Sequence, residues 1–239
     1  MMTYNTFIFD LDGTLLDTLG DLAASTNYAL RTHGMPEHPI DDVRRFVGNG
    51  VRNLMQRAVP GGEANPDFEA AFATFREHYM NHSLDTTRPY PGIPETLAAL
   101  KARGCRLAVV SNKMMAATQD LCNHFFADTI QVAIGENEAA GIRKKPAPDT
   151  VFEALKRLGV HKGTVHKGTG ARLCRFDRRT LCTSAVYVGD SDVDIETARN
   201  AGLPCISVLW GFRDRDFLMR HGAKTFISTP SELLITQFV

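Results

Sequence analysis

Residues 7–14 read Phe-Ile-Phe-Asp-Leu-Asp-Gly-Thr, an apolar run that stops at two carboxylates spaced one residue apart. The β-branched and aromatic residues from Thr6 to Phe9 are typical of a strand covered on both faces in a parallel sheet. Open α/β sheets bind ligands at the carboxyl ends of their strands, which is where Asp10 and Asp12 stand. Side chains alternate along an extended chain, so both carboxylates should point the same way, and Gly13 permits a tight turn around a small anion. The stretch predicts a ligand site that contains a cation.

Two more apolar runs end in polar residues. Leu107–Val110 is followed by Ser111 and Asn112, which offer a hydroxyl and an amide. Ala185–Val188 is followed by residues 189–194, Gly-Asp-Ser-Asp-Val-Asp. Each motif has an ordinary alternative, since Ser and Asn are preferred helix N-caps and acids are favoured at a helix start. Because parallel strands end at one edge of the sheet, the polar residues that follow these strands should lie together, which favours a single site instead.

A lysine belongs to the same arrangement. Lys145 stands before Pro146 and ahead of a helical pattern from Asp149 to Leu158. A single lysine is usually a solvated surface charge, and Asp-x-Asp-Gly-Thr alone can be an ordinary turn. Coincidence is a poor explanation for four polar motifs in this order, namely Asp10 with Asp12, Ser111 with Asn112, Lys145, and residues 189–194. We therefore expect Lys145 to face the acids.

The ordered motifs resemble those of the haloacid dehalogenase superfamily, in its phosphatase branch, over most of the chain. The resemblance implies that Asp10 is a nucleophile that forms an aspartyl-phosphate, and that Asp12 is the general acid and base. It implies Mg²⁺ as cofactor. The residues implied for the metal are Asp10, Asp12 through its backbone carbonyl, Asp190 and, indirectly, Asp194. The residues implied for phosphate or substrate are Gly13, Thr14, Ser111, Asn112 and Lys145, with Ser111 and Lys145 holding the phosphoryl oxygens.

The chemistry of phosphoryl transfer calls for the same inventory. Charge spreads over the equatorial oxygens of the transferred group, so catalysis depends on in-line positioning and on cations and hydrogen-bond donors. A carboxylate nucleophile such as Asp10 is repelled by a phosphate monoester, and a hard cation offsets that repulsion. A second carboxyl such as Asp12 can protonate the leaving alkoxide and then activate water. Dehalogenases and phosphonate-cleaving relatives lack an acid at the position of Asp12, so this residue favours the phosphatases. The sequence contains no P-loop motif, which excludes a P-loop kinase or GTPase.

Composition sets limits on partners and location. The 239 residues carry 27 basic and 27 acidic side chains, so nothing in the net charge of zero indicates nucleic acid or an anionic membrane as partner. Five scattered cysteines without CxxC pairs suit a reducing compartment. No apolar stretch approaches 18 residues and no signal peptide precedes the first predicted strand. We expect a cytoplasmic monomer or homodimer that acts on a small phosphorylated metabolite.

A helical segment interrupts the α/β pattern between residues 17 and 86. Apolar residues recur at three- and four-residue intervals near both of its ends, from Leu19 to Leu30 and from Phe68 to Tyr79. We expect a doubly wound, Rossmann-like parallel sheet formed by residues 1–16 and 87–239, with an inserted α-helical cap at 17–86. Closure of such a cap would exclude water from the site and add specificity contacts.

Two loops carry the expectations about substrate. Residues 46–52, Phe-Val-Gly-Asn-Gly-Val-Arg, read as a helix-joining turn or, alternatively, as a loop in which Gly48, Asn49 and Arg52 approach the substrate. This loop and residues 210–213, Trp-Gly-Phe-Arg, resemble phosphoglycolate phosphatases. That subfamily is therefore favoured, with a pyrophosphatase or sugar-phosphate mutase of the same superfamily, or a non-enzymatic phospho-ligand sensor, as alternatives.

One segment departs from the pattern of the superfamily. An insert at about 161–184 contains six Lys or Arg residues against one acid and repeats His-Lys-Gly-Thr. It connects a predicted helix to the start of a predicted strand, so we expect it at the sheet edge opposite the site and outside the chemistry. A disordered loop, a basic patch for an anionic partner and a small docked hairpin are its alternatives, of which the first and third are favoured.

Overall fold

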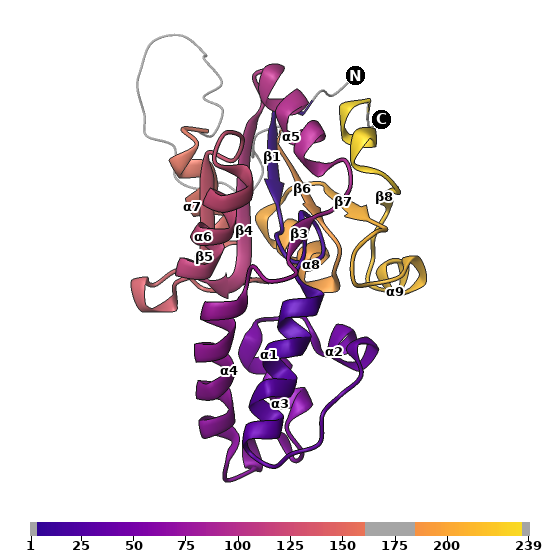
Figure 1. The fold of residues 1–239 in the computed structure, drawn as a ribbon. Coiled ribbons are helices and arrows are strands. Elements are labelled where there is room, and N and C mark those ends of the chain that lie inside the picture. Colours follow the sequence, from indigo (N-terminus) through magenta and orange to yellow (C-terminus); the bar gives the residue numbers. More distant parts are fainter. Residues whose placement is uncertain (1–3, 161–184, 236–239) are drawn as a thin grey trace.

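Figure 1 shows a parallel sheet wrapped by helices, with a second helical unit at one end of the sheet. The computed structural model describes residues 4–160 and 185–235. The predicted insert at 161–184 lies outside the described residues. No helix within the described ranges is both long and apolar enough to cross a membrane.

The main sheet has six parallel strands in the order β5-β4-β1-β6-β7-β8. Crossover connections of this kind need helices on the sheet faces, as the sequence predicts for a doubly wound fold. The predicted strand at Thr6–Phe9 is confirmed and lies at the centre of the sheet, between β4 and β6. The strands are β1 (Thr6–Phe9), β4 (Arg106–Met114), β5 (Val132–Glu136), β6 (Ala185–Gly189), β7 (Cys205–Val208) and β8 (Thr225–Ile227).

Alternating side chains of β1 divide the core into two layers. Phe7 and Phe9 pack on one face with residues of α5 and α6, whereas Ile8 packs on the other face with residues of α7 and α8. All three side chains are buried, which explains why the strand reads as a continuous apolar run rather than an alternating one. The helices of this core are α5 (Ile93–Ala102), α6 (Met115–Phe126), α7 (Asp149–Arg157), α8 (Asp192–Ala201) and α9 (Arg215–Arg220), with short 3-10 turns η2 (Glu138–Ala140) and η3 (Pro230–Leu234).

The second unit is helical and has a hydrophobic core of its own. The apolar stripes that predict helices at its two ends lie on α1 and α4, and they bury Leu22, Leu30, Phe75 and Tyr79 in one cluster. In Figure 1 this unit lies beyond the carboxyl ends of the central strands. Its elements are α1 (Leu19–Thr32), α2 (Ile40–Phe46), α3 (Val51–Ala58), η1 (Gly62–Ala64) and α4 (Phe68–His82).

Two chain crossings join the helical unit to the sheet unit. They pair as a small antiparallel sheet of β2 (Leu16–Asp17) and β3 (Arg88–Pro89). Asp21 in the first turn of α1 ties the two crossings together, because its buried carboxylate accepts hydrogen bonds from the backbone N–H and the hydroxyl of both Thr86 and Thr87, over 2.5–2.9 Å. The boundaries of a cap at residues 17–86 stay a prediction.

Candidate active site

Three neighbouring strands deliver polar side chains to one edge of the sheet. The register places Phe9 of β1 opposite Val109 of β4 and Val188 of β6, so Asp10 follows the central strand at the level where the other two also turn polar. β4 does not end at Val110, as the sequence suggests, but continues to Met114 with an irregular register, because Met114 pairs with Glu136 of β5. Ser111 and Asn112 therefore lie within the end of β4.

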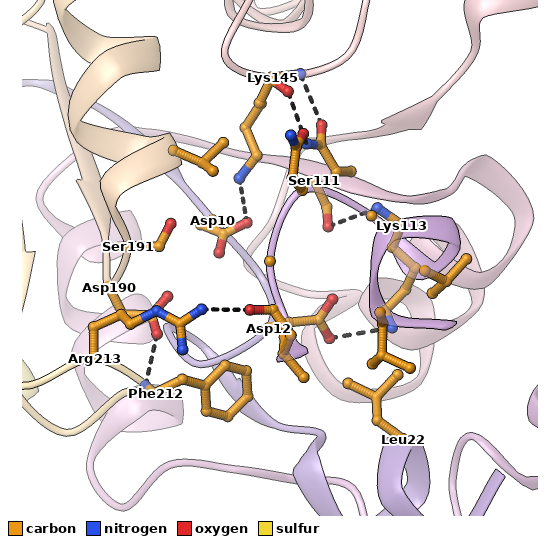
Figure 2. A pocket seen from close by; sticks show the side chains of 18 residues that line it. Asp10, Asp12, Leu22, Ser111, Lys113, Lys145, Asp190, Ser191, Phe212 and Arg213 are labelled. Atoms are coloured by element: carbon orange, nitrogen blue, oxygen red, sulfur yellow. Dashed lines mark hydrogen bonds and ion pairs between the residues drawn. The ribbon is translucent and has the colours of Figure 1, made fainter. Parts of the chain in front are cut away.

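Lys145 forms the electrostatic centre of the site. Its ammonium donates to Oδ1 of Asp10 at 2.6 Å and to Oδ1 of Asp194 at 2.8 Å, and it also reaches the hydroxyl of Tyr187 at 3.2 Å. All four groups are buried. Figure 2 shows the lysine side chain descending onto Asp10 from a loop above the strand ends. The expectation that Lys145 faces the acids is thus met by the geometry.

Asn112 fixes the backbone that carries this lysine. Its Oδ1 accepts a hydrogen bond from the N–H of Lys145 at 2.7 Å, and its Nδ2 donates to the carbonyl of the same residue at 2.9 Å. Asn112 is buried, so both backbone groups would otherwise be stranded away from water. A third contact, from Nδ2 to Oδ1 of Asn49 at 3.3 Å, reaches the helical unit.

Both oxygens of Asp194 are held by protein donors. Oδ1 accepts from Lys145 and from the hydroxyl of Tyr187, and Oδ2 accepts from the N–H and hydroxyl of Ser191 at 3.1 and 2.6 Å. The Ser191 hydroxyl accepts in turn from the N–H of Asp194, which makes a reciprocal cap at the start of α8. This arrangement fixes the carboxylate that faces Lys145.

Asp190 lies against the first motif loop. Its Oδ1 accepts from the hydroxyl of Thr14 at 3.3 Å and its Oδ2 from the N–H of Phe212 at 2.7 Å. Gly13 has a φ of +83°, and a Cβ there would stand 2.4 Å from Oδ2 of Asp190, so this turn has no room for a side chain. The indole N–H of Trp210 donates to the carbonyl of Thr14 at 3.0 Å and ties residues 210–213 to the loop.

Asp12 lies on the side of the site that faces the helical unit. Its Oδ1 accepts from the hydroxyl of Thr18 at 2.7 Å and pairs with the ammonium of Lys113 at 3.2 Å. Lys113 also donates to the hydroxyl of Tyr79 on α4 at 2.6 Å. Figure 2 shows Asp12 between Lys113 on one side and Phe212 on the other.

Asp10, Asp190 and Asp194 together carry more negative charge than the ammonium of Lys145 offsets. Burial, and then the charge of Asp194, raises the pKa of Asp10 well above its ordinary value, although Lys145 lowers it. Burial and Asp194 likewise raise the pKa of Asp190 to about 7. Burial alone would lower the pKa of Lys145, but the charges of Asp10 and Asp194 raise it. One oxygen from each of the three acids lies within 4.8 Å of the others, an all-oxygen set that suits a hard divalent cation.

The loop between α2 and α3 covers the site from the helical unit. Gly48, Asn49 and Gly50 all have positive φ values, of +129°, +61° and +92°, and all three line the cavity around Asp10. The loop is therefore both a helix-joining turn and a wall of the cavity. Arg52 lies elsewhere: its guanidinium pairs with Glu63 at 2.7 Å and with Glu69, over the ring of Phe68.

Two hollows adjoin at this loop. The cavity around Asp10 has a volume of about 70 Å³, with Leu22, Val51, Leu54 and Val193 as apolar walls. A wider hollow of about 870 Å³ lies next to it and is lined by Arg52 together with residues of α4, α6 and the β5–η2 segment. Asn49, Gly50 and Val51 line both.

Several residues of the site escape a reading of the motifs alone. Lys113 directly follows Ser111 and Asn112, and this adjacency is the feature of the sequence that could have placed it in the site. Tyr79 belongs to an apolar helical stripe and Tyr187 to an apolar strand, so their spacing indicates only core packing. Arg213 lines the cavity and donates to the carbonyl of Arg44 at 3.0 Å and to that of Val47, at the end of α2.

Comparisons with known proteins agree with this fold. The sequence model of the family described as haloacid dehalogenase-like hydrolase matches residues 7–166, and a second model of HAD-hydrolase-like proteins matches residues 142–230. The chain therefore belongs to the haloacid dehalogenase-like hydrolases, and the predicted superfamily and α/β fold class are confirmed.

Curated relatives and solved structures cover nearly the whole chain. A phosphoglycolate phosphatase of Aquifex aeolicus is 33% identical over 205 residues, which are 86% of this chain and 84% of that protein. An N-acetylmuramic acid 6-phosphate phosphatase of Pseudomonas aeruginosa is 30% identical over 237 residues, 98% of this chain and 94% of that protein. A crystal structure from Lactobacillus delbrueckii subsp. bulgaricus superposes with a TM-score of 0.84 at 34% identity and covers 97% of each chain.

Proposed function

We propose that this chain is a Mg²⁺-dependent phosphatase that hydrolyses a small phosphomonoester, 2-phosphoglycolate, through an aspartyl-phosphate on Asp10. One observation carries the proposal: Asp10 lies at the end of the central strand, against the ammonium of Lys145, in a cavity that Asp12 and Asp190 also line. Its relatives include several named phosphoglycolate phosphatases, and the family is one of hydrolases.

The donor set fits a magnesium ion. Asp10 and Asp190, with the backbone carbonyl of Asp12, would hold it, because hard cations prefer carboxylate and carbonyl oxygens. Burial and then the charge of Asp194 raise the pKa values of both Asp10 and Asp190, and a divalent cation would favour their charged forms. The ion would screen the nucleophile from the phosphate and neutralise charge that develops on the phosphoryl oxygens. Asp194, whose oxygens are occupied by Lys145 and Ser191, would instead hold that lysine in place.

In the first half-reaction, an oxygen of Asp10 attacks phosphorus as the bond to the leaving oxygen breaks. Asp12 supplies the proton that this leaving oxygen requires. The ammonium of Lys145 and the hydroxyl of Ser111 hold the phosphoryl oxygens. The N–H groups of Gly13 and Thr14 donate to the carbonyls of Leu16 and Leu11, so in this scheme they shape the turn and do not contact phosphate.

In the second half-reaction, water hydrolyses the aspartyl-phosphate. Asp12, now a carboxylate, accepts the proton of the attacking water, which restores its acid form. Residues 17–86, treated as a cap, cover this step with the loop of Gly48 and Asn49, so that bulk water is excluded. Arg52, held by Glu63 and Glu69, takes no part in binding phosphate in this scheme.

The size of the cavity favours a short leaving group. A volume of about 70 Å³, lined by charged and polar side chains as well as apolar ones, suits the short skeleton of glycolate better than a sugar. A second substrate class is favoured by one observation, the wider hollow of about 870 Å³ next to the cavity, which has room for a sugar ring. The relative named for N-acetylmuramic acid 6-phosphate makes an amino-sugar phosphate the second candidate.

Phosphate release tests both the chemistry and the substrate. We expect release from phosphoglycolate only with Mg²⁺, loss of release in Asp10→Asn, and an acid-stable, hydroxylamine-sensitive phosphoenzyme in rapid quench of the wild type. Preference for N-acetylmuramic acid 6-phosphate or pyrophosphate would keep the mechanism and refute the substrate. An isomeric sugar phosphate as product would indicate a mutase, and binding without turnover would indicate a sensor.

Location and assembly complete the proposal. We propose a cytoplasmic enzyme that is a monomer or homodimer and has neither nucleic acid nor membrane as partner. Fractionation of the native cells tests the location and the absence of a membrane partner, and sedimentation of the purified chain alone and with nucleic acid tests the other two statements.

A further inference from the structure

Lys113 is a buried cation that bridges the two units of the protein. Its ammonium, with 1% of the side chain exposed, contacts the hydroxyl of Tyr79 at 2.6 Å and Oδ1 of Asp12 at 3.2 Å. The ammonium also lies 4.5 Å from the centre of the Tyr79 ring. A charge held this far from water is costly unless it is paired, so Lys113 depends on partners from both units.

The contacts of Asp12 leave one carboxylate oxygen for chemistry. Lys113 and the hydroxyl of Thr18 both meet Oδ1. Oδ2 is then the oxygen that can exchange a proton with a substrate, and its direction is set by the two contacts on Oδ1. A carboxyl held by two donors from different elements has little freedom to rotate, which is what an acid aimed at one leaving oxygen requires.

The other end of the bridge belongs to the helical unit. Tyr79 lies on α4, is fully buried, and stacks on Phe75 within the cluster that α1, α3 and α4 share. Its hydroxyl can meet Lys113 only while this unit rests against the end of β4. The position of the cap is thereby transmitted to the carboxyl of Asp12 through one ammonium.

We propose that Lys113 is a positioning residue for Asp12, and that Tyr79 completes this positioning only when the cap lies on the core. Because the inference rests on the proposed role of Asp12 as general acid, it adds to that function a dependence of leaving-group protonation on the cap. The step itself balances: the Asp12 proton passes to the leaving oxygen as the P–O bond breaks and the bond from Asp10 to phosphorus forms.

Leaving groups of different acidity isolate this step. An alkoxide needs a proton as it departs, whereas p-nitrophenolate departs without one, so only alkyl phosphates need a well-aimed acid. The ratio kcat/KM covers events up to the first irreversible step, formation of the phosphoenzyme, and is insensitive to the later role of Asp12 as base. A merely structural loss would lower kcat/KM for both substrates alike.

The experiment compares kcat/KM for phosphoglycolate, ethyl phosphate and p-nitrophenyl phosphate. The variants are Lys113→Met, Tyr79→Phe, the double variant, and Asp12→Ala as the reference for a missing acid. Tyr28→Phe is the matched control, since it removes a tyrosine hydroxyl from the same helical unit at a site that is 40% exposed. Circular dichroism and thermal melts establish which variants are folded.

We expect Asp12→Ala to lose about 10²- to 10⁴-fold on the alkyl phosphates, the usual contribution of general acid catalysis. Lys113→Met should lose about tenfold or more on them and less than about threefold on p-nitrophenyl phosphate, and Tyr79→Phe should show the same selectivity with a smaller loss. The double variant should be no worse than Lys113→Met, because Tyr79 acts through Lys113. Tyr28→Phe should match the wild type.

Equal losses on alkyl and aryl phosphates would overturn the inference. A loss on phosphoglycolate but not on ethyl phosphate would also overturn it, by assigning Lys113 to the carboxylate of the substrate. If Lys113→Met does not fold, the selectivity of Tyr79→Phe decides the question. Failure of the wild type to hydrolyse any of the three, or an Asp12→Ala variant without leaving-group selectivity, would instead refute the proposed function.

Discussion

Replacement of Asn112 by alanine tests how the site holds its central lysine. The change removes two buried hydrogen bonds to the backbone of Lys145, at 2.7 and 2.9 Å. At about 1–1.5 kcal/mol for each bond, the free energy of unfolding should fall by about 2–3 kcal/mol. For a chain of this size that corresponds to a decrease in Tm of about 4–12 °C.

Activity should fall as well, because the loop that carries the ammonium loses its anchor. A displacement of about 1 Å at a catalytic group can cost about 10²-fold, so we expect kcat to fall by about tenfold to 10²-fold. The assays are thermal denaturation followed by circular dichroism, and phosphate release at saturating substrate and Mg²⁺.

Asn200→Ala is the matched control for Asn112→Ala. Asn200 donates a single exposed hydrogen bond, of 2.8 Å, to the carbonyl of Pro146 in the same loop. Its loss should cost only about 0.5–1 kcal/mol and leave kcat close to that of the wild type. If the two variants lower Tm equally, or if Asn112→Ala keeps full turnover, the idea that Asn112 anchors Lys145 is refuted.

Three further results are expected. Asp21→Ala should lower the free energy of unfolding by about 2–4 kcal/mol in urea titrations, since it leaves the buried N–H and hydroxyl of Thr87 without their hydrogen-bond acceptor. A change below about 0.5 kcal/mol would contradict the idea that Asp21 holds the two crossings together. Gly13→Ala should weaken Mg²⁺ binding in calorimetry, because the new Cβ meets a carboxylate oxygen of Asp190 at 2.4 Å, and unchanged affinity would exclude this turn from the metal site. Removal of divalent ions by EDTA should abolish turnover of the wild type and Mg²⁺ should restore it, whereas Lys145→Met should stay inactive at every Mg²⁺ concentration.

Local patterns predict the parts of the fold that local chemistry determines. The apolar run at Thr6–Phe9 and the stripes from Leu19 and from Phe68 appear as the expected strand and helices, because burial on both faces or on one stripe leaves a periodic trace. The convergence of Asp10 and Asp190 follows from parallel strands that end at one edge of a sheet. These inferences need no knowledge of distant contacts.

Residues whose roles depend on packing between units escape such patterns. Tyr79 is indistinguishable in sequence from its apolar neighbours on α4, and only the docking of that helix against β4 brings its hydroxyl to Lys113. Arg52 shows the same dependence on other elements: a basic residue beside a glycine loop suggests an anion, and its pairing with Glu63 and Glu69 leaves no local trace in the sequence. Long-range pairing decided both cases.

The bond from Trp210 to the carbonyl of Thr14 gives the protein an optical probe at a useful place. The chain contains one tryptophan, so its emission excited at 295 nm reports on a single indole, and that indole is bonded to the turn that follows Asp10 and Asp12. Magnesium or phosphate arriving at this turn would change the polarity around one fluorophore. Binding of magnesium or phosphate at this site can therefore be followed in the unlabelled enzyme, in real time and without turnover.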